Sequence, residues 1–216
     1  MKLISFTRNI DSNPIRNRLD IIKVILQTND YLIDRQYSLV QCNERIDKNC
    51  PFLYVEKMSR LFIPENSDDQ VQKLYSIVFP FSYNVEQNEL STTQIAINNS
   101  LNSCLKSIVY SFDKALPDSM NKIQDFCLEA CVDNDFPDVL YEIVVTILTR
   151  LLTFDVGYIR YDYDEEHYNG RIHPLHHLDI NYTNQSTYKI GLNQSLDILE
   201  FKSIIDNQKE CWFLHK

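Results

Sequence analysis

The histidines of this chain gather near its C-terminal end, and chemistry is expected there first. Four of the five histidines and all three glycines lie between Gly157 and Gly191. Histidine is the side chain most often used for proton transfer and metal binding, because its charge changes near neutral pH. Residues 159–182, which we call the histidine hairpin, are therefore the first candidate site.

Alternating side chains predict two strands within the histidine hairpin. In residues 159–164 and 178–182, apolar side chains alternate with polar ones, which is typical of half-buried strands. Asn169-Gly170 between them predicts a type I′ turn, since both central positions of that turn need a positive φ. A turn centred there fixes the register, because a slip of one residue would reverse every side chain. The pairs predicted to lie opposite each other are Tyr161 with Leu178, Asp162 with His177, and Arg160 with Asp179.

The polar pairs share one half-exposed face of the predicted hairpin, and their role is open between three interpretations. In the first they are structural cross-strand pairs, each contributing roughly 0.2–1 kcal/mol. In the second they form a general acid–base site. His177 would then transfer the proton, Asp162 would orient it, and Arg160 would stabilise an anion.

The third interpretation is a divalent-metal site. His173, His177 and Asp179, with Asp162 beside them, offer imidazole and carboxylate ligands, which suit zinc, manganese or iron. Pro174 restricts how His173 approaches the other ligands. A divalent metal is the one cofactor that these residues indicate. His176 points to the opposite, apolar face and is expected to serve the structure.

Other catalytic motifs find little support. The three glycines form no phosphate-binding loop, and no serine nucleophile elbow precedes a helix. Arg160 and His167 match the spacing of a helical class of ribonuclease toxins only loosely, because here the two residues fall on a strand and a hairpin tip.

Apolar residues at helical spacing predict the elements that position the hairpin. Ser12-Asn13-Pro14 indicates the start of the first helix. Ser67 and Gln70 resemble a capping box for a short helix through Leu74, while residues 52–55 and 77–79 favour short strands. A further strand is expected at 188–192. The longer predicted helices cover residues 15–28, 101–112, 118–131, 138–152 and 196–205.

These elements predict an α+β fold in a single domain, residues 1–216. A bundle of about five helices, in residues 1–154, would pack on a small antiparallel sheet made of the histidine hairpin and one further strand. The sheet and a closing helix would occupy residues 157–216. The helix after Pro137 has apolar residues on more than one face, so we expect it to be the most buried element.

Charge and cysteine usage limit the function classes. The net charge of −9 disfavours a protein that mainly grips nucleic-acid phosphates, although a local basic groove would still permit it. The six cysteines are scattered, with no Cys-x-x-Cys pair and no signal peptide before them. Reduced, buried thiols in a cytoplasmic protein are expected, with Cys127 and Cys131 as core residues rather than half of a metal site. No apolar run is long enough to cross a membrane.

The histidine hairpin resembles an uncharacterised bacterial family, domain of unknown function 2290. The similarity lies in Arg160-x-Asp162-Tyr-Asp, followed by His173-Pro174-x-x-His177-Leu-Asp-Ile and the strand Tyr188-Lys-Ile-Gly-Leu192. Asp179 departs from the His-Leu-His-Ile form expected in that family, and the departure weakens a metal site that needs a third imidazole. The resemblance covers the last third of the chain and implies little about chemistry.

By analogy, the resemblance places the protein among components of bacterial multiprotein systems such as phage defence or toxin–antitoxin pairs. We therefore expect a non-enzymatic or regulatory subunit that acts by binding another protein, without a membrane. The alternative is a nuclease or another hydrolase that uses the histidine hairpin as an acid–base or metal site.

Overall fold

The computed structural model divides the chain into two compact units, each built from separate stretches of sequence. Unit 1 comprises Met1–Asn9, Ser38–Phe79 and Val156–Lys216, and unit 2 comprises Ile10–Tyr37 and Pro80–Asp155. The single-domain organisation stays a prediction. The structure describes residues 2–10, 15–41, 47, 49–55, 58–67, 70–92, 95–112, 116–133, 136, 138–183 and 185–213.

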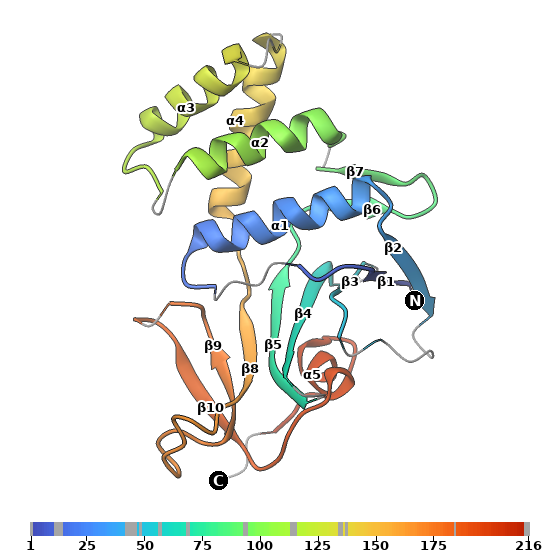
Figure 1. The fold of residues 1–216 in the computed structure, drawn as a ribbon, viewed down its shortest axis with the longest axis vertical. Helices are drawn as coiled ribbons and strands as arrows, with labels where there is room; N and C mark the ends of the chain where they lie inside the picture. The colour runs from blue at the N-terminus through green and yellow to red at the C-terminus, as the bar shows by residue number, and fades with distance from the viewer. Residues whose placement is uncertain are drawn as a thin grey trace. The chain divides into compact units, whose positions relative to one another are not determined.

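Unit 1 is organised around one antiparallel sheet of eight strands in the order β10-β9-β8-β5-β4-β3-β1-β2. In Figure 1, β8 lies between β9 and β5, so the histidine hairpin joins strands from the N-terminal third of the chain. The strands are β1 (Lys2–Phe6), β2 (Tyr37–Gln41), β3 (Phe52–Tyr54), β4 (Arg60–Ser67), β5 (Gln70–Val78), β8 (Ile159–Tyr163), β9 (His176–Ile180) and β10 (Tyr188–Leu192).

The prediction of a small, three-stranded sheet is therefore wrong, although the fold is α+β overall. Residues 37–78 contribute four of the sheet's strands, and the predicted helix from Ser67 to Leu74 is a hairpin between β4 and β5. The reason is burial on both faces. Leu61, Phe62 and Ile63 are consecutive and all buried, so the alternation that identifies a half-exposed strand is absent there.

One face of the sheet packs against the closing helix, α5 (Ile198–Ile205). Phe52 and Phe62 stack with ring centroids 4.6 Å apart, and Phe201 of α5 meets Phe62 edge-on at 6.2 Å. Tyr161 and Leu178 of the histidine hairpin belong to this same apolar cluster. Because neighbours along a strand point to opposite faces, Arg160 and Asp162 lie on the other side of the sheet.

The described residues of unit 2 form four helices and a short hairpin of β6 (Ser82–Asn84) and β7 (Glu89–Ser91). Helix α1 (Arg18–Ile33) begins at a capping box of Asn17 and Asp20, so the helix starts after the predicted signal, which lies outside the described residues in Ser12–Pro14. The other helices agree with the predicted ones: α2 (Asn99–Ser111), α3 (Met120–Asp133) and α4 (Asp138–Thr153). No helix among the described residues is long and apolar enough to span a membrane.

The cysteines of unit 2 are core residues. Cys104 of α2 and Cys127 and Cys131 of α3 are buried free thiols. Burial raises the pKa of Cys104 to about 12 and that of Cys127 to about 11. Both thiols therefore stay protonated, and a protonated thiol is a poor metal ligand.

Helix α1, rather than α4, is the most buried of the described helices. It buries nine residues, and α4 buries Val144, Ile147, Leu148 and Leu151. The expectation that the helix after Pro137 would be the most buried is wrong, because apolar residues on several faces of α4 are only partly covered.

Leu148→Ala is expected to lower the free energy of unfolding by about 2–5 kcal/mol, because the Leu148 side chain is fully buried and its loss leaves a cavity. Chemical denaturation measures the change. Leu128→Ala is the matched control, since Leu128 of α3 is 53% exposed and should lose well under about 1 kcal/mol. Equal losses in the two variants would contradict the placement of α4 in the core.

Candidate functional site

The strands of the histidine hairpin pair in the predicted register. Asp162 of β8 lies opposite His177 of β9, and Arg160 lies opposite Asp179. The predicted turn is wrong, however. The strands stop at Tyr163 and resume at His176, a bridge between Asn169 and His173 closes the tip, and of the two predicted turn residues only Gly170 has a positive φ. The alternation of the strands, rather than a type I′ turn, therefore sets the register.

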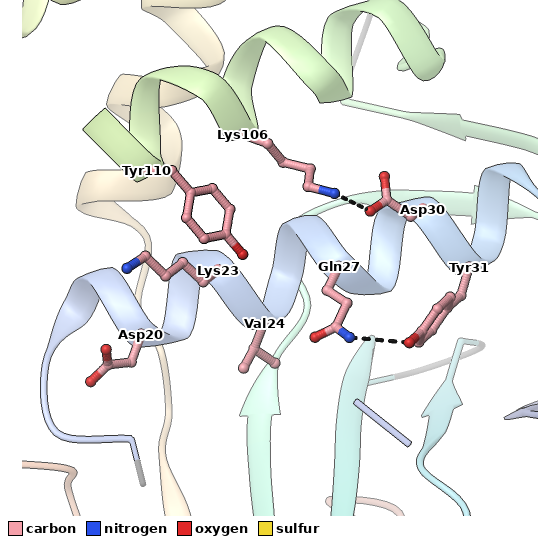
Figure 2. A pocket seen from close by; sticks show the side chains of 8 residues that line it. All are labelled: Asp20, Lys23, Val24, Gln27, Asp30, Tyr31, Lys106 and Tyr110. Atoms are coloured by element: carbon pink, nitrogen blue, oxygen red, sulfur yellow. Dashed lines mark hydrogen bonds and ion pairs between the residues drawn. The ribbon is translucent and has the colours of Figure 1, made fainter. Parts of the chain in front are cut away.

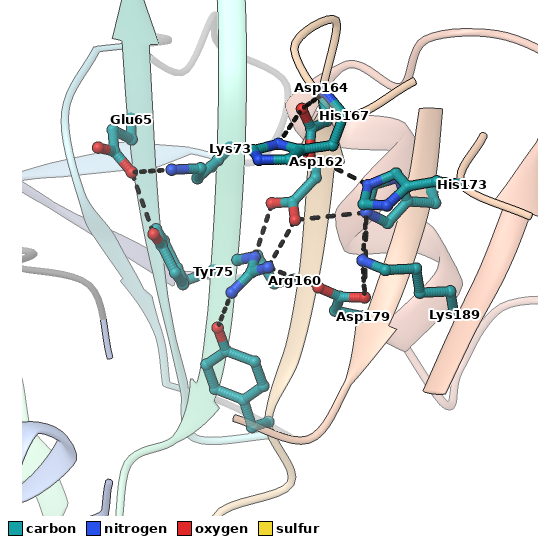
Figure 3. Close-up of polar contacts among 12 residues, drawn as sticks. Glu65, Lys73, Tyr75, Arg160, Asp162, Asp164, His167, His173, Asp179 and Lys189 are labelled. Carbon is teal, nitrogen blue, oxygen red and sulfur yellow. Dashed lines mark hydrogen bonds and ion pairs between the residues drawn. The ribbon is translucent and has the colours of Figure 1, made fainter. Parts of the chain in front are cut away.

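The polar face of the hairpin carries a connected group of charges, which we call the polar cluster: Arg160, Asp162, His177, Asp179 and Lys189. The Arg160 guanidinium donates to both carboxylate oxygens of Asp162 at 2.6 Å and to Asp179 Oδ2 at 2.5 Å. Figure 3 shows Arg160, Asp162, Asp179 and Lys189 converging across β8, β9 and β10. Two carboxylates and two cations balance, so the cluster is neutral as it stands.

His177 is fully buried, in contrast to the half-exposed position expected from the sequence. Its Nδ1 lies 2.8 Å from the Pro174 carbonyl oxygen, and its Nε2 lies 2.8 Å from Lys189 Nζ. A carbonyl only accepts and an ammonium only donates, so Nδ1 carries the proton and Nε2 presents its lone pair. A backbone carbonyl that fixes the far nitrogen in this way is the usual support of a metal-binding histidine.

Both carboxylates of the polar cluster are buried, and that of Asp162 stays charged near neutral pH. Burial alone would raise the pKa of the Asp162 carboxyl, but the two hydrogen bonds and the charge of the Arg160 guanidinium outweigh burial and lower the pKa to about 2. Burial raises the pKa of Tyr158, whose hydroxyl accepts from Arg160, to about 12, although Arg160 lowers it in part. Asp162 and Tyr158 therefore keep one protonation state near neutral pH and do not serve as general acid or base there.

The ligands predicted for a metal are brought together in part. Asp162, His177 and Asp179 each offer an atom within 4.8 Å of the others, and among the described residues no other set of three histidines, cysteines or carboxylates does so. His177 Nε2 lies 3.5 Å from Asp162 Oδ2 and 3.9 Å from Asp179 Oδ1. One imidazole and two carboxylates make a donor set for zinc, manganese or iron.

His173 lies beside this donor set rather than in it. Its Nε2 contacts Asp164 Oδ2 at 3.1 Å, while its ring meets the His177 ring edge-on at 4.8 Å. His167 contacts the other oxygen of Asp164 at 3.0 Å. Burial would raise the pKa of Asp164, but its hydrogen bonds with His167 outweigh burial and lower it. Of the predicted metal ligands, His173 is thus engaged elsewhere.

Lys189 is the member of the cluster that sequence reasoning missed. Its Nζ lies 2.8 Å from His177 Nε2 and 2.8 Å from Asp179 Oδ1. Lys189 pairs with Asp179 across β9 and β10. The sequence did contain a signal for Lys189. If the predicted strand 188–192 pairs next to the hairpin, its alternation places Lys189 on the same polar face as Asp179.

Solvent reaches the cluster from two sides. The Lys189 side chain is 31% exposed on the edge strand β10. Asp162 also borders a pocket of about 330 Å³ whose other lining residues are Gln72, Lys73, Tyr163, Asp164, Glu165, Glu166 and His167. A small ligand can therefore approach buried Asp162 without unfolding the hairpin.

His176 lies on the opposite, apolar face of the hairpin, as predicted. Tyr161 Oη lies 2.9 Å from His176 Nδ1, and the His176 ring stacks on Tyr163 with centroids 5.2 Å apart. Burial lowers the pKa of His176. His176 is therefore a natural control for changes at His177, its neighbour in the chain.

Unit 2 holds a second pocket, of about 460 Å³, between α1 and α2 (Figure 2). Its lysines are already engaged: Lys106 Nζ lies 2.6 Å from Asp30 Oδ2, and Lys23 Nζ lies 5.1 Å from the centre of the Tyr110 ring. These contacts satisfy the cations within the pocket, so we assign no chemistry to it.

Comparisons with models of protein families, with curated proteins and with solved structures found no match. The resemblance to domain of unknown function 2290 therefore rests on the quoted residues alone and stays a prediction.

Proposed function

We propose that this protein is a divalent-cation-dependent hydrolase of phosphate esters, and that the polar cluster is its catalytic site. One observation carries the proposal: the Nε2 of a fully buried histidine, which accepts from Lys189, converges with two buried carboxylates. Burying two carboxylates and two cations together costs free energy, and apolar side chains of similar volume would often stabilise the fold better. Function is a reason to retain such a group.

Charge favours an anionic substrate. The cluster is neutral with its two carboxylates, Arg160 and Lys189, so a bound divalent cation would give it two excess positive charges. The adjoining pocket adds no net positive charge, because Lys73 pairs with Glu65 and the carboxylates of Asp164, Glu165 and Glu166 line it as well, so the positive charge would come from the cluster itself. A phosphate ester suits such a site, because its charge grows on the oxygens that the cations face.

Each residue has a role in this proposal. Asp162, His177 and Asp179 would hold the cation, and Arg160 holds both carboxylates in place. A bound cation would lower the pKa of a coordinated water and polarise the phosphoryl group. The water oxygen forms a bond to phosphorus, the bond from phosphorus to the leaving oxygen breaks, and the water's proton passes to that oxygen. His173 and Asp164 border the site and position His177 through the ring contact.

The test is hydrolysis of bis(4-nitrophenyl) phosphate and of single-stranded RNA by the purified full chain. The protein is treated with EDTA, dialysed, and assayed with Mn²⁺, Mg²⁺ or no metal. We expect hydrolysis that depends on added metal and is lost again with EDTA. Equal rates with and without metal, or no hydrolysis of either substrate by folded protein, would overturn the proposal.

A second candidate function is the one that the sequence favoured, a non-enzymatic subunit of a bacterial phage-defence or toxin–antitoxin system that binds another protein. The observation in its favour is a stripe of exposed apolar side chains on α3, at Met120, Leu128 and Val132. Apolar stripes of this kind often contact partners. In either case we propose that the protein works in the cytoplasm, where its free cysteines stay reduced.

A pull-down from the native host separates the two candidates. If the α3 stripe binds a partner, a protein captured by the tagged wild type should be lost with Leu128→Glu and Val132→Glu and kept with His177→Ala. If the variants with Leu128→Glu and Val132→Glu capture the same protein as the wild type, binding through this stripe is contradicted.

A further inference from the structure

The Lys189 ammonium occupies the position that a cation would take in the polar cluster. It contacts both His177 Nε2 and Asp179 Oδ1 at 2.8 Å, and these atoms belong to two of the three residues that form the cation-binding set. In Figure 3, Lys189 reaches toward Asp179 from β10, the edge strand of the sheet.

We propose that Lys189 is an exchangeable occupant of the cation site: a divalent cation displaces its ammonium, and the displaced ammonium then binds the anionic substrate. This inference rests on the proposed function of the polar cluster. It adds that Lys189 blocks the cation-binding position until a divalent cation displaces it. Without a cation the cluster is neutral and blocked, and with a cation it gains both a metal and a free ammonium.

Lys189 and a divalent cation cannot bind His177 at the same time, because its imidazole offers only one lone pair. Because His177 Nδ1 is held by the Pro174 carbonyl, Nε2 has a single lone pair to offer. That lone pair accepts from Lys189 or binds a cation, and it cannot do both.

Lys189 is also the cation of the cluster that is able to leave. It lies on an edge strand, is partly exposed, and has a long flexible side chain. Arg160, in contrast, is tied to both carboxylates by three hydrogen bonds. Burial would lower the pKa of Arg160, but the hydrogen bonds with Asp162 raise it above its usual value, so Arg160 stays charged and in place.

Mn²⁺ binding to full-length Lys189→Met tests the exchange. Removing the ammonium removes the competitor and leaves the cluster with one excess negative charge, so the Kd for Mn²⁺, measured by calorimetry without substrate, should fall at least about tenfold relative to wild type. Lys189→Arg, which keeps the charge, should not tighten binding in this way. An unchanged or weaker affinity in folded Lys189→Met would overturn the proposal.

A second measurement uses the wild-type protein and does not depend on the variant folding. Acetylation of lysines by an N-hydroxysuccinimide ester is followed by mass spectrometry with and without Mn²⁺. Labelling of Lys189 should rise several-fold with Mn²⁺, while labelling of Lys122, an exposed lysine paired with Asp118, should not change. Equal labelling of Lys189 in both conditions contradicts displacement.

These readouts are separate from the proposed hydrolysis. Tighter Mn²⁺ binding by Lys189→Met together with no hydrolysis by the wild type would support the exchange and reject the hydrolase. Metal-dependent hydrolysis with no change in Lys189 labelling would reject the exchange and support the hydrolase.

Discussion

His177→Ala is expected to reduce cation-dependent hydrolysis at least about 100-fold, because it removes the only imidazole of the donor set and the lone pair that faces the two carboxylates. Initial rates with bis(4-nitrophenyl) phosphate at saturating Mn²⁺ measure the loss. Because His177 is fully buried, the variant also loses packing, and thermal melting of the same preparation must accompany the assay.

Two further variants separate lost chemistry from lost folding. Asp179→Asn keeps the shape of the side chain and removes the charge, so it should lose activity to a similar degree while remaining folded. His176→Ala changes the neighbouring histidine on the opposite face and should keep its activity in proportion to folded protein. Full hydrolytic activity in well-folded His177→Ala would exclude both the acid–base and the metal interpretations of His177 and reject the polar cluster as the catalytic site.

Arg160→Met is expected to lower the free energy of unfolding by about 3–5 kcal/mol at pH 7, since it leaves two buried carboxylates short of their main counter-charge. Urea denaturation measures the change. The control is Arg171→Met, at an exposed position of the hairpin tip, which should stay within about 0.5 kcal/mol of wild type. A loss below about 1 kcal/mol in Arg160→Met would show that the guanidinium does not hold the cluster together.

The pH dependence of stability should follow the same contacts. The Asp162 carboxyl has a folded-state pKa of about 2 against an ordinary value of 3.8, so it binds fewer protons in the folded state. Its contribution, about 2 kcal/mol, is present above pH 4 and is lost as the pH falls toward 2. In Arg160→Met the folded-state pKa of Asp162 rises toward or above its ordinary value, so the loss of stability between pH 4 and pH 2 should shrink. Urea denaturation between pH 2 and 7 compares the two proteins, and coincident profiles would contradict the assignment.

The register of the histidine hairpin could be predicted because one of its faces is apolar and the other polar. Tyr161 and Leu178 belong to the apolar cluster under α5, and their neighbours in the chain are forced to the opposite side. The hairpin tip carried no such signal. Asn169-Gly170 suggested a two-residue turn, yet the strands separate at Tyr163 and a longer loop carries His167 and His173 to Asp164.

The large sheet could not be predicted, because its inner strands are buried on both faces. Phe62 and Ile63 point in opposite directions and are equally hidden, so no period of two appears in β4. The same limit applies to the site. The pairing of its residues across β8 and β9 follows from alternation. The complete burial of His177 and the position of Lys189 beside it depend on the pairing of β10 with β9, whereas the sequence predicted β10 only as a strand.

Anomalous scattering from crystals grown with Mn²⁺ tests the central claim most directly. We expect one manganese peak bounded by Asp162, His177 Nε2 and Asp179, with ligand distances of roughly 2.0–2.3 Å. Lys189 Nζ should have moved away from His177. Crystals with no peak between these three residues, and with Lys189 still in contact with His177 Nε2 at millimolar Mn²⁺, would contradict the claim that the polar cluster is a cation-binding catalytic site.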